Sequence, residues 1–210
     1  CMLEMSGISK KFPGVTALES VQFSIRRGEV VALIGENGAG KSTLMKILAG
    51  IYLPDQGTIH LDGKPVSINS PRDSARLGIG TIHQELEVID TLDVAANVFL
   101  GREPVWGGPL RLVDRRKIHA AAGEVLARVG LNISPNQPLR DLSTAQKQLV
   151  EIARALSQHA RLLIMDEPTS SLTLSETERL IQVVADLRSN GGSGVFISHR
   201  LSEIERLADR

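Results

Sequence analysis

Residues 35–43 read Gly-Glu-Asn-Gly-Ala-Gly-Lys-Ser-Thr and match the pattern G-x-x-x-x-G-K-[ST]. Glycines at 35, 38 and 40 allow a tight loop whose backbone N–H groups turn inward and bind an anion. The preceding segment, 29–34, has the apolar character of a buried strand, and apolar residues recur at helical spacing after the loop. A strand, a glycine-rich loop and a helix in this order predict a site for the phosphates of a nucleotide. The alternative is a glycine-rich turn between strand and helix that binds no ligand.

Each residue type in this loop has a chemical role. The helix that follows directs the positive end of its dipole at the phosphates. Lys41 is expected to bridge the β- and γ-phosphates, and the hydroxyl of Ser42 is expected to hold Mg²⁺. The residues expected to surround the nucleotide phosphates are Gly35, Asn37, Gly38, Ala39, Gly40, Lys41, Ser42 and Thr43.

Composition limits the other possibilities. A chain of 210 residues suits one domain, or one domain with a small insert. Lysine and arginine total 24, as do aspartate and glutamate, so the chain has no basic excess for nucleic acid. Cys1 excludes an internal disulfide framework, and no apolar run reaches the length of about 18 residues that a membrane span needs. We therefore expect a soluble, cytoplasmic protein.

Two adjacent carboxylates, Asp166 and Glu167, follow a continuous apolar strand at 162–165. Ligands of an open α/β sheet bind beyond the carboxyl ends of its strands. Asp166 is expected to bind Mg²⁺ through water, and Glu167 to accept a proton from a water in line with the γ-phosphate. The alternative is a pair of acids at the entry to a helix.

Further side chains are placed to meet the same ligand. Gln84 and His199 each follow a short apolar strand, at 79–83 and 195–198. A carboxamide there can meet Mg²⁺ or the attacking water, and a histidine can hydrogen-bond the γ-phosphate or orient a carboxylate. Phe12 lies in a loop, where its ring can stack on a base. The plain alternatives are a polar loop residue, an incidental histidine and an aromatic that caps a small sheet.

The stretch 142–146 reads Leu-Ser-Thr-Ala-Gln and opens a helix. Ser143 is of the N-cap type. One apolar face of the helix consists of Leu149, Ile152, Ala153 and Leu156. By spacing alone, this is a capped amphipathic helix with no further role.

In this order and spacing, these segments resemble the nucleotide-binding domain of ABC transporters, and the likeness runs from Leu3 to the end of the chain. The resemblance implies an α/β fold of the P-loop NTPase class. Its parts are a mainly parallel sheet flanked by helices, an antiparallel β subdomain and a helical insert at about 91–157, within one ABC ATPase domain over 1–210. The implied positions are Walker A at 35–43, the Q-loop glutamine at Gln84, the signature at 142–146, Walker B with its catalytic glutamate at 162–167, the switch histidine at His199, and base-binding residues Phe12 and Val15.

The local sequence also resembles the bacterial ATPases that drive simple-sugar importers. The stretches that carry this likeness are 11–15, 40–50, 83–86, 150–156 and 197–201. In that subfamily two ATPase halves are fused, and this chain resembles the N-terminal half of a longer protein. The resemblance implies Mg-dependent ATP hydrolysis by a peripheral subunit at the cytoplasmic face of the inner membrane. The implied partners are a second ATPase half, fused or homodimeric, a membrane permease and, indirectly, an extracytoplasmic sugar-binding protein. Nucleic acid is not expected.

This sequence departs from the family pattern at several positions. The usual signature, Leu-Ser-Gly-Gly-Gln, is here 142–146 with Ala145 in place of the second glycine. The resemblance implies that Ser143 and Gln146 bind the nucleotide of the opposing ATPase half, and the Cβ of Ala145 is expected to weaken that composite site. Thr173 stands where many relatives carry aspartate. Glycines at 191, 192 and 194 predict that the next strand is short or frayed.

Other functions remain open at this stage. A soluble ABC ATPase acting on ribosomes or DNA has the same motifs, and it is expected to show a basic face or a long coiled-coil insert, neither of which is visible. A nucleotide kinase has no place for the signature-like segment or His199. A regulatory half that binds ATP with little turnover disagrees with the pair Asp166 and Glu167, whereas Ala145 and Thr173 leave it open.

Overall fold

The computed structural model describes residues 1–210 except 37, 83–85, 87, 107–111, 159, 170, 171 and 199. The side chains of 105, 106 and 112 also lie outside the description. The chain divides into two compact units. The first consists of Cys1–Thr81, Ala160–Glu167 and Val184–Arg210, and the second of Ile82–His159 and Pro168–Val183.

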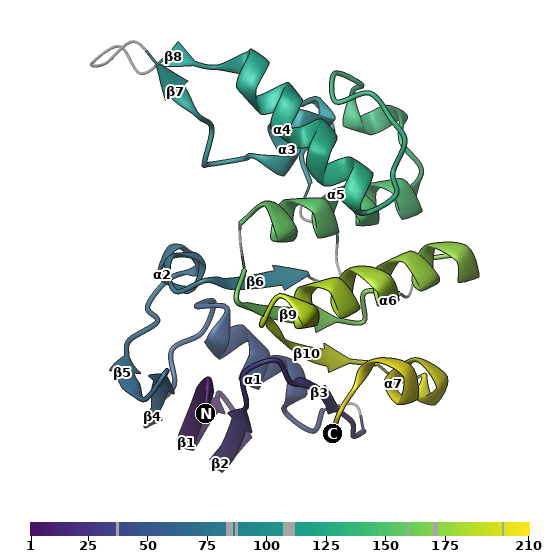
Figure 1. The fold of residues 1–210 in the computed structure, drawn as a ribbon. Coiled ribbons are helices and arrows are strands. Elements are labelled where there is room, and N and C mark those ends of the chain that lie inside the picture. Colours follow the sequence, from purple (N-terminus) through teal and green to yellow (C-terminus); the bar gives the residue numbers. More distant parts are fainter. Residues whose placement is uncertain are drawn as a thin grey trace. The chain divides into compact units, whose positions relative to one another are not determined.

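The first unit contains a sheet in the order β3 (Val30–Leu33), β10 (Ser193–Ile197), β9 (Leu162–Asp166) and β6 (Ile79–Ile82). β10 pairs in parallel with both β3 and β9 (Figure 1). Every residue of β10 is buried, as are the first four of β9. Nearly continuous apolar strands of this kind are typical of parallel sheets that are covered on both faces.

An antiparallel sheet in the same unit has the order β2 (Val15–Ile25), β1 (Leu3–Phe12), β4 (Gln56–Leu61) and β5 (Lys64–Val66). The Asp-Gly pair at 62–63 predicts a hairpin turn between strands at 57–61 and 66–68, and the structure confirms the turn. Both of its residues have positive φ, 50° and 74°, as a type I′ turn requires. The second strand of the hairpin lies two residues earlier than the predicted 66–68.

One hydrophobic cluster joins both sheets to the helix that follows the glycine-rich loop, α1 (Lys41–Leu48). From α1 the cluster contains Leu44, Met45, Ile47 and Leu48. Ser70 and Pro71 predict the start of a helix, and α2 (Pro71–Arg76) begins there. The hydroxyl of Ser70 accepts a hydrogen bond from the backbone N–H of Asp73, and proline takes the first position. The last helix is α7 (Leu201–Leu207).

The second unit is mainly helical. Helices α3 (Val94–Val98), α4 (Arg115–Arg128) and α5 (Thr144–Ser157) contact one another, and a short 3₁₀ turn, Leu139–Asp141, precedes α5. Ala95, Ile118 and Ala122 are buried together beside Phe99. Two short strands, β7 (Val105–Trp106) and β8 (Leu112–Val113), also pair here. Helix α6 (Leu174–Ser189) runs from this unit into the first.

The sequence at 21–25 predicts a strand, and in the structure this strand, β2, starts earlier. β2 begins at Val15, which pairs with Phe12 across the turn at 13–14. Ser20 has a φ of 48°, and the pairing of β1 with β2 shifts register in this region. A bulge of this kind interrupts the alternation of apolar and polar residues, so the first half of the strand was missed.

The expectation of a frayed strand at 191–194 is wrong for its last two residues. Ser193 pairs with Leu162, and Gly194 lies between Val30 and Leu163. A Cβ on Gly194 would lie 3.2 Å from Cε of Met165, so a larger residue would make a tight contact there. The hydroxyl of Ser193 is fully buried and accepts from the N–H of Gly28 at 2.9 Å.

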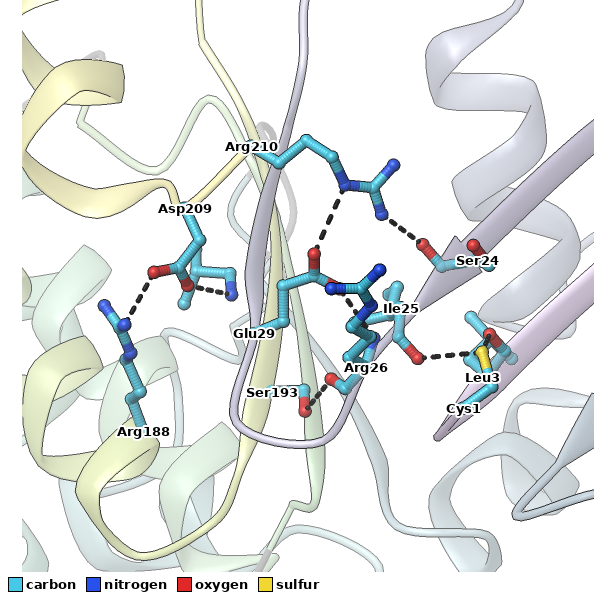
Figure 2. A network of polar contacts seen from close by, with 11 residues as sticks. Cys1, Leu3, Ser24, Ile25, Arg26, Glu29, Arg188, Ser193, Asp209 and Arg210 are labelled. Carbon is cyan, nitrogen blue, oxygen red and sulfur yellow. Dashed lines mark hydrogen bonds and ion pairs between the residues drawn. The ribbon is translucent and has the colours of Figure 1, made fainter.

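The free edge of β3 is covered by the residues that follow α7. The N–H of Asp209 donates to the carbonyl of Val30 at 2.8 Å, and the N–H of Ala32 donates to the carbonyl of Arg210 at 2.7 Å. The carboxylate of Asp209 accepts from the N–H of Val30 and pairs with Arg188 at 2.6 Å (Figure 2). β3 therefore has hydrogen-bond partners on both sides.

Glu29 anchors the same network from the turn before β3 (Figure 2). Its carboxylate accepts from the N–H of Arg26 at 2.6 Å and from Nε of Arg210 at 3.2 Å. Burial raises the pKa of Glu29, but the N–H of Arg26 and the guanidinium of Arg210 together lower it more. The net pKa lies below that of an ordinary glutamate.

This direction gives a test of the network. A lowered folded-state pKa stabilises the fold above the ordinary glutamate pKa, and the stabilisation is lost as pH falls through the folded value. Replacing Glu29 with Gln should lower the free energy of unfolding near neutral pH by about 0.5–1.5 kcal/mol. The deficit should shrink as the pH is lowered, measured by urea unfolding in a pH series. Glu19→Gln, at an exposed position, is the control. If Glu29→Gln lowers the free energy of unfolding by the same amount at every pH, the interpretation is contradicted.

Candidate nucleotide-binding site

The pairing register brings the carboxyl ends of three strands to one level. Leu33 of β3 lies opposite Ile197 of β10, and Ile197 lies opposite Asp166 of β9. Neighbouring strands are about 4.8 Å apart, so the three ends lie within about 10 Å of one another. The glycine-rich loop follows the first end and the two carboxylates follow the third. Because ligands of open α/β sheets bind beyond the carboxyl ends of strands, this edge is the candidate site.

Gly40 determines how the loop enters α1. It has a left-handed backbone with φ 85°, and a Cβ there would lie 2.6 Å from the carbonyl oxygen of Ala17 and 2.7 Å from Cδ2 of Leu18. The loop therefore packs directly against β2. Gly40 is the N-cap of α1, and no side chain of the described residues caps the helix. The first N–H groups of α1 thus remain available to an anion, as in known phosphate sites.

Lys41 lies over the loop. Its Nζ donates to the carbonyl oxygens of Gly35 at 2.6 Å and Glu36 at 2.8 Å. An ammonium group has three donors, so one more N–H can reach a phosphate oxygen. Asn37 lies outside the described residues. Of the described loop residues, Gly35 follows β3, Gly38, Ala39 and Gly40 directly precede α1, and Lys41, Ser42 and Thr43 form its first turn.

The backbone of Glu167 is strained. Its φ is 48°, which is uncommon for a residue other than glycine, and its N–H donates to the carbonyl of Ile197 at 2.9 Å. The bond ties Glu167 to the end of the neighbouring strand. Strained backbone of this kind clusters at functional sites, where the surrounding structure holds it in place.

The residues of the site also agree with binding of Mg²⁺. No group of three or more His, Cys, Asp or Glu side chains that could hold a metal ion occurs in the part of the chain that the structure describes. Mg²⁺ at phosphate-transfer sites needs only one or two protein oxygens, because the substrate phosphates and water supply the rest. Ser42 in the first turn of α1 and Asp166 at the end of β9 offer such oxygens. Gln84 lies outside the described residues.

A buried carboxylate that the sequence analysis missed organises the end of β10. Glu203 of α7 accepts from the hydroxyl of Ser198 and from Nη1 of Arg200, both at 3.1 Å. The hydroxyl of Ser198 in turn accepts from the N–H of Arg200. His199, between these two residues, lies outside the described residues. Glu203 looks in the sequence like an ordinary acid in a helical first turn, so no local pattern reveals it.

Phe12 and Val15 lie at the tip of the hairpin between β1 and β2. They pair directly, and Val15 is 61% exposed. The ring of Phe12 meets the ring of Tyr52 edge to face, with 5.2 Å between centroids. Val15 lies two residues before Ala17, the residue that touches Gly40. A half-exposed apolar surface next to the phosphate loop is suited to stacking with a base.

Ser143 and Gln146 lie in the second unit, at the start of α5, and form a capping box. The Ser143 hydroxyl accepts from the N–H of Gln146 at 3.2 Å, and Gln146 Oε1 accepts from the N–H of Ser143 at 2.9 Å. The predicted N-cap is therefore confirmed, and the predicted apolar face is buried. Because the hydroxyl acts here as an acceptor, its O–H can still donate to a phosphate.

Thr173 begins α6 in a similar way. Its hydroxyl donates to the carboxylate of Glu176 at 2.7 Å, and its N–H donates to the same carboxylate at 2.9 Å. The N–H of Glu176 returns a long hydrogen bond to the Thr173 hydroxyl at 3.4 Å. These reciprocal bonds make a capping box that starts the helix.

Comparison with known proteins agrees with this geometry. Residues 18–170 match the family model described as ABC transporter. The chain belongs to this family. A ribose import ATP-binding protein of Streptomyces avermitilis is 53% identical to this ABC chain over 209 residues. That alignment covers 100% of this chain and 40% of the relative, so the chain spans about two fifths of the length of the curated relatives it matches.

Solved structures confirm the predicted fold class. A nucleotide-free ATP-binding cassette from an ABC transporter superposes with a TM-score of 0.86 at 26% identity, over 99% of this chain and 85% of the other. A dimeric ATP-binding cassette in a post-hydrolysis state, bound to ADP and Pi, superposes with a TM-score of 0.83 at 25% identity. This alignment covers 98% of this chain and 91% of the other. None of the helices described in this ABC chain has the length and apolar character required to cross a membrane.

Two glycines with the same backbone provide a matched test of the loop. Gly38 and Gly40 have φ of 84° and 85°, but a Cβ on Gly38 meets nothing within 4 Å. Gly38→Ala should cost about 1–2 kcal/mol of unfolding free energy from backbone strain alone. Gly40→Ala should cost about 1–3 kcal/mol more, because the loop must move away from β2. Urea unfolding without nucleotide measures both, and equal costs would show that the close packing against β2 is unimportant.

Proposed function

We propose that this chain binds and hydrolyses Mg-ATP and drives a membrane importer for a simple sugar. The observation that carries the proposal is that β3, β10 and β9 end at the same edge of the sheet. The glycine-rich loop therefore starts near Asp166 and Glu167. The name of the Streptomyces relative supports the transported class, since that protein is named for ribose import.

Binding of the triphosphate rests on the loop and α1. Among the described residues no side chain caps the N–H groups at the start of α1, and these groups carry the positive end of the helix dipole. Lys41 adds a full charge, held over the loop by the carbonyls of Gly35 and Glu36. Phe12 and Val15 bind the base on the other side of Gly40. These contacts hold the β- and γ-phosphates in one orientation for in-line attack.

Hydrolysis requires a base beside the γ-phosphate. A water attacks the γ-phosphorus, its proton passes to the carboxylate of Glu167, and the bond to the β-phosphate oxygen breaks to release ADP. Lys41 stabilises the charge that develops on the transferred group. Ser42, Asp166 and Gln84 would hold Mg²⁺, which supplies further charge neutralisation on the phosphates when bound. Gln84 and His199 are proposed to sense the γ-phosphate.

The complete site needs a second ATPase half. Ser143 and Gln146 are proposed to meet the nucleotide of that half, fused or as a second copy, and its equivalent segment meets the nucleotide bound here. The dimeric cassette bound to ADP and Pi supports such an arrangement. Ala145 is expected to weaken the composite site that this chain contributes to.

The proposed assembly is peripheral, at the cytoplasmic face of the inner membrane. A membrane permease is the direct partner, and an extracytoplasmic sugar-binding protein acts through that permease. A ribosome- or DNA-directed ABC ATPase is less well supported, because the net charge of the chain is zero and offers no basic footprint.

The role of Glu167 gives a direct test. Glu167→Gln keeps the size of the side chain and removes its basicity, so ATP affinity should stay within about twofold while turnover falls by at least about 100-fold. Phosphate release measures turnover, and equilibrium binding measures affinity. Asp186→Asn, distant from the strand ends in sequence, is the control. Unchanged turnover in Glu167→Gln would overturn the assignment of the base.

The transport role has a separate test. The full-length protein, tagged and isolated from gently solubilised cells, should copurify with a polytopic membrane protein in stoichiometric amount. Sugars can then be screened against the binding protein encoded beside that permease. Recovery of ribosomes or DNA without a membrane partner would contradict the importer proposal and leave the ATP site in place.

A further inference from the structure

A short segment after α1, residues 52–55, holds the end of β1 at several points. The N–H of Asp55 donates to the carbonyl of Ser9 at 2.9 Å. The carboxylate of Asp55 accepts from Nζ of Lys10 and from the backbone N–H of Lys11, each at 2.7 Å. The ring of Tyr52 meets the ring of Phe12 at 5.2 Å between centroids and 68° between planes. The last four residues of β1 therefore all contact this segment.

The same segment is fastened to the helix of the phosphate loop. The N–H groups of Ile51 and Tyr52 both donate to the carbonyl of Lys46, at 2.9 and 3.2 Å. Nζ of Lys46 also lies 5.8 Å from the centroid of the Tyr52 ring. Lys46 belongs to α1, whose first turn contains Lys41 and Ser42. Residues 52–55 thus connect the phosphate end of the site to the base end.

β1 needs such support because its pairing with β2 is irregular near the tip. The register shifts between Ile8 and Lys10 and again between Lys10 and Lys11. At such irregularities the ladder of backbone hydrogen bonds is interrupted and the strand bends. The pairing of β1 with β4 ends at Ser9, so beyond it Lys11 and Phe12 pair with β2, at Thr16 and Val15. The side chains of Tyr52 and Asp55 add a further constraint on this end of β1.

We propose that Tyr52 and Asp55 are positioning residues for base recognition, which hold Phe12 at a fixed distance from the phosphate loop. This inference rests on the proposed ATP site and adds residues that do not touch the phosphates. Its consequence is selective: a ligand with a base and a triphosphate depends on both ends of the site, whereas inorganic tripolyphosphate depends on the loop alone. Loss of the Tyr52 or Asp55 contacts should weaken binding of the ligand with a base and leave binding of tripolyphosphate unchanged.

Charge contributes to the same contact. Hydrogen bonding from Lys10, and then from the N–H of Lys11, lowers the pKa of the Asp55 carboxyl, so Asp55 is charged at neutral pH. Nζ of Lys10 lies 5.8 Å from the centroid of the Phe12 ring. Asp55 therefore holds both the backbone of Lys11 and the cation that lies over Phe12.

The test compares two ligands in the full-length protein. Calorimetry should measure Mg-ATP and tripolyphosphate binding to wild type, Tyr52→Ala, Tyr52→Phe and Asp55→Ala, with the site on this chain identified as the one lost in Lys41→Ala. Tyr52→Ala and Asp55→Ala should each lower the affinity for ATP by about three- to tenfold. This is the range expected for loss of one aromatic or charged contact. Tripolyphosphate affinity should change by less than about twofold, and Tyr52→Phe should bind ATP like the wild type because the ring contact remains.

The outcomes separate this inference from the proposed function. Equal weakening of ATP and tripolyphosphate in Tyr52→Ala, or no weakening of either, would overturn the positioning role and leave the ATP site standing. In a Phe12→Ala background, Tyr52→Ala should cause no further loss, and an additional loss of full size would also overturn it. ATP binding that survives Lys41→Ala would instead overturn the proposed phosphate site itself.

Discussion

β10 pairs with β3 on one side and with β9 on the other, and the geometry of the site depends on that pairing. It places Leu33, Ile197 and Asp166 at one level, so the loop at 35–43 and the pair Asp166 and Glu167 start from a common edge. Neighbouring side chains lie close where β10 enters the sheet. A Cβ on Gly194 would lie 3.2 Å from Cε of Met165, a tight contact that a glycine avoids.

A second close approach joins the antiparallel sheet to the same edge. Gly40 packs so tightly against Ala17 and Leu18 of β2 that a Cβ has no room. This contact brings the hairpin tip with Phe12 and Val15 beside the phosphate loop. Residues 52–55 then fix the other side of the tip. The two ends of the nucleotide site thus belong to different sheets, and both backbone and side-chain contacts join them.

Sequence alone predicted the parts of this site whose chemistry restricts the choice of residue. The loop needs glycines and a lysine in fixed order, and the carboxylates follow a buried apolar strand, so both were found. The parts that depend on contacts distant in sequence were missed. Ser193 and Gly194 have loop-like composition, yet a buried hydroxyl and a crowded neighbour make them strand. Glu203 and Tyr52 look ordinary, since their partners become visible only when the chain is folded.

The departures from the family pattern at Ala145 and Thr173 lie at similar positions in the fold. Each lies in or beside the first turn of a helix. Ala145 replaces a glycine in the first turn of α5, where alanine has the higher helix propensity, and Ser143 and Gln146 still close a complete capping box around it. Thr173 closes a second capping box with Glu176 at the start of α6. Both helix starts are therefore well formed without the usual residues. Any weakening of the composite site should then come from the added Cβ and the missing carboxylate themselves, not from a disordered helix terminus.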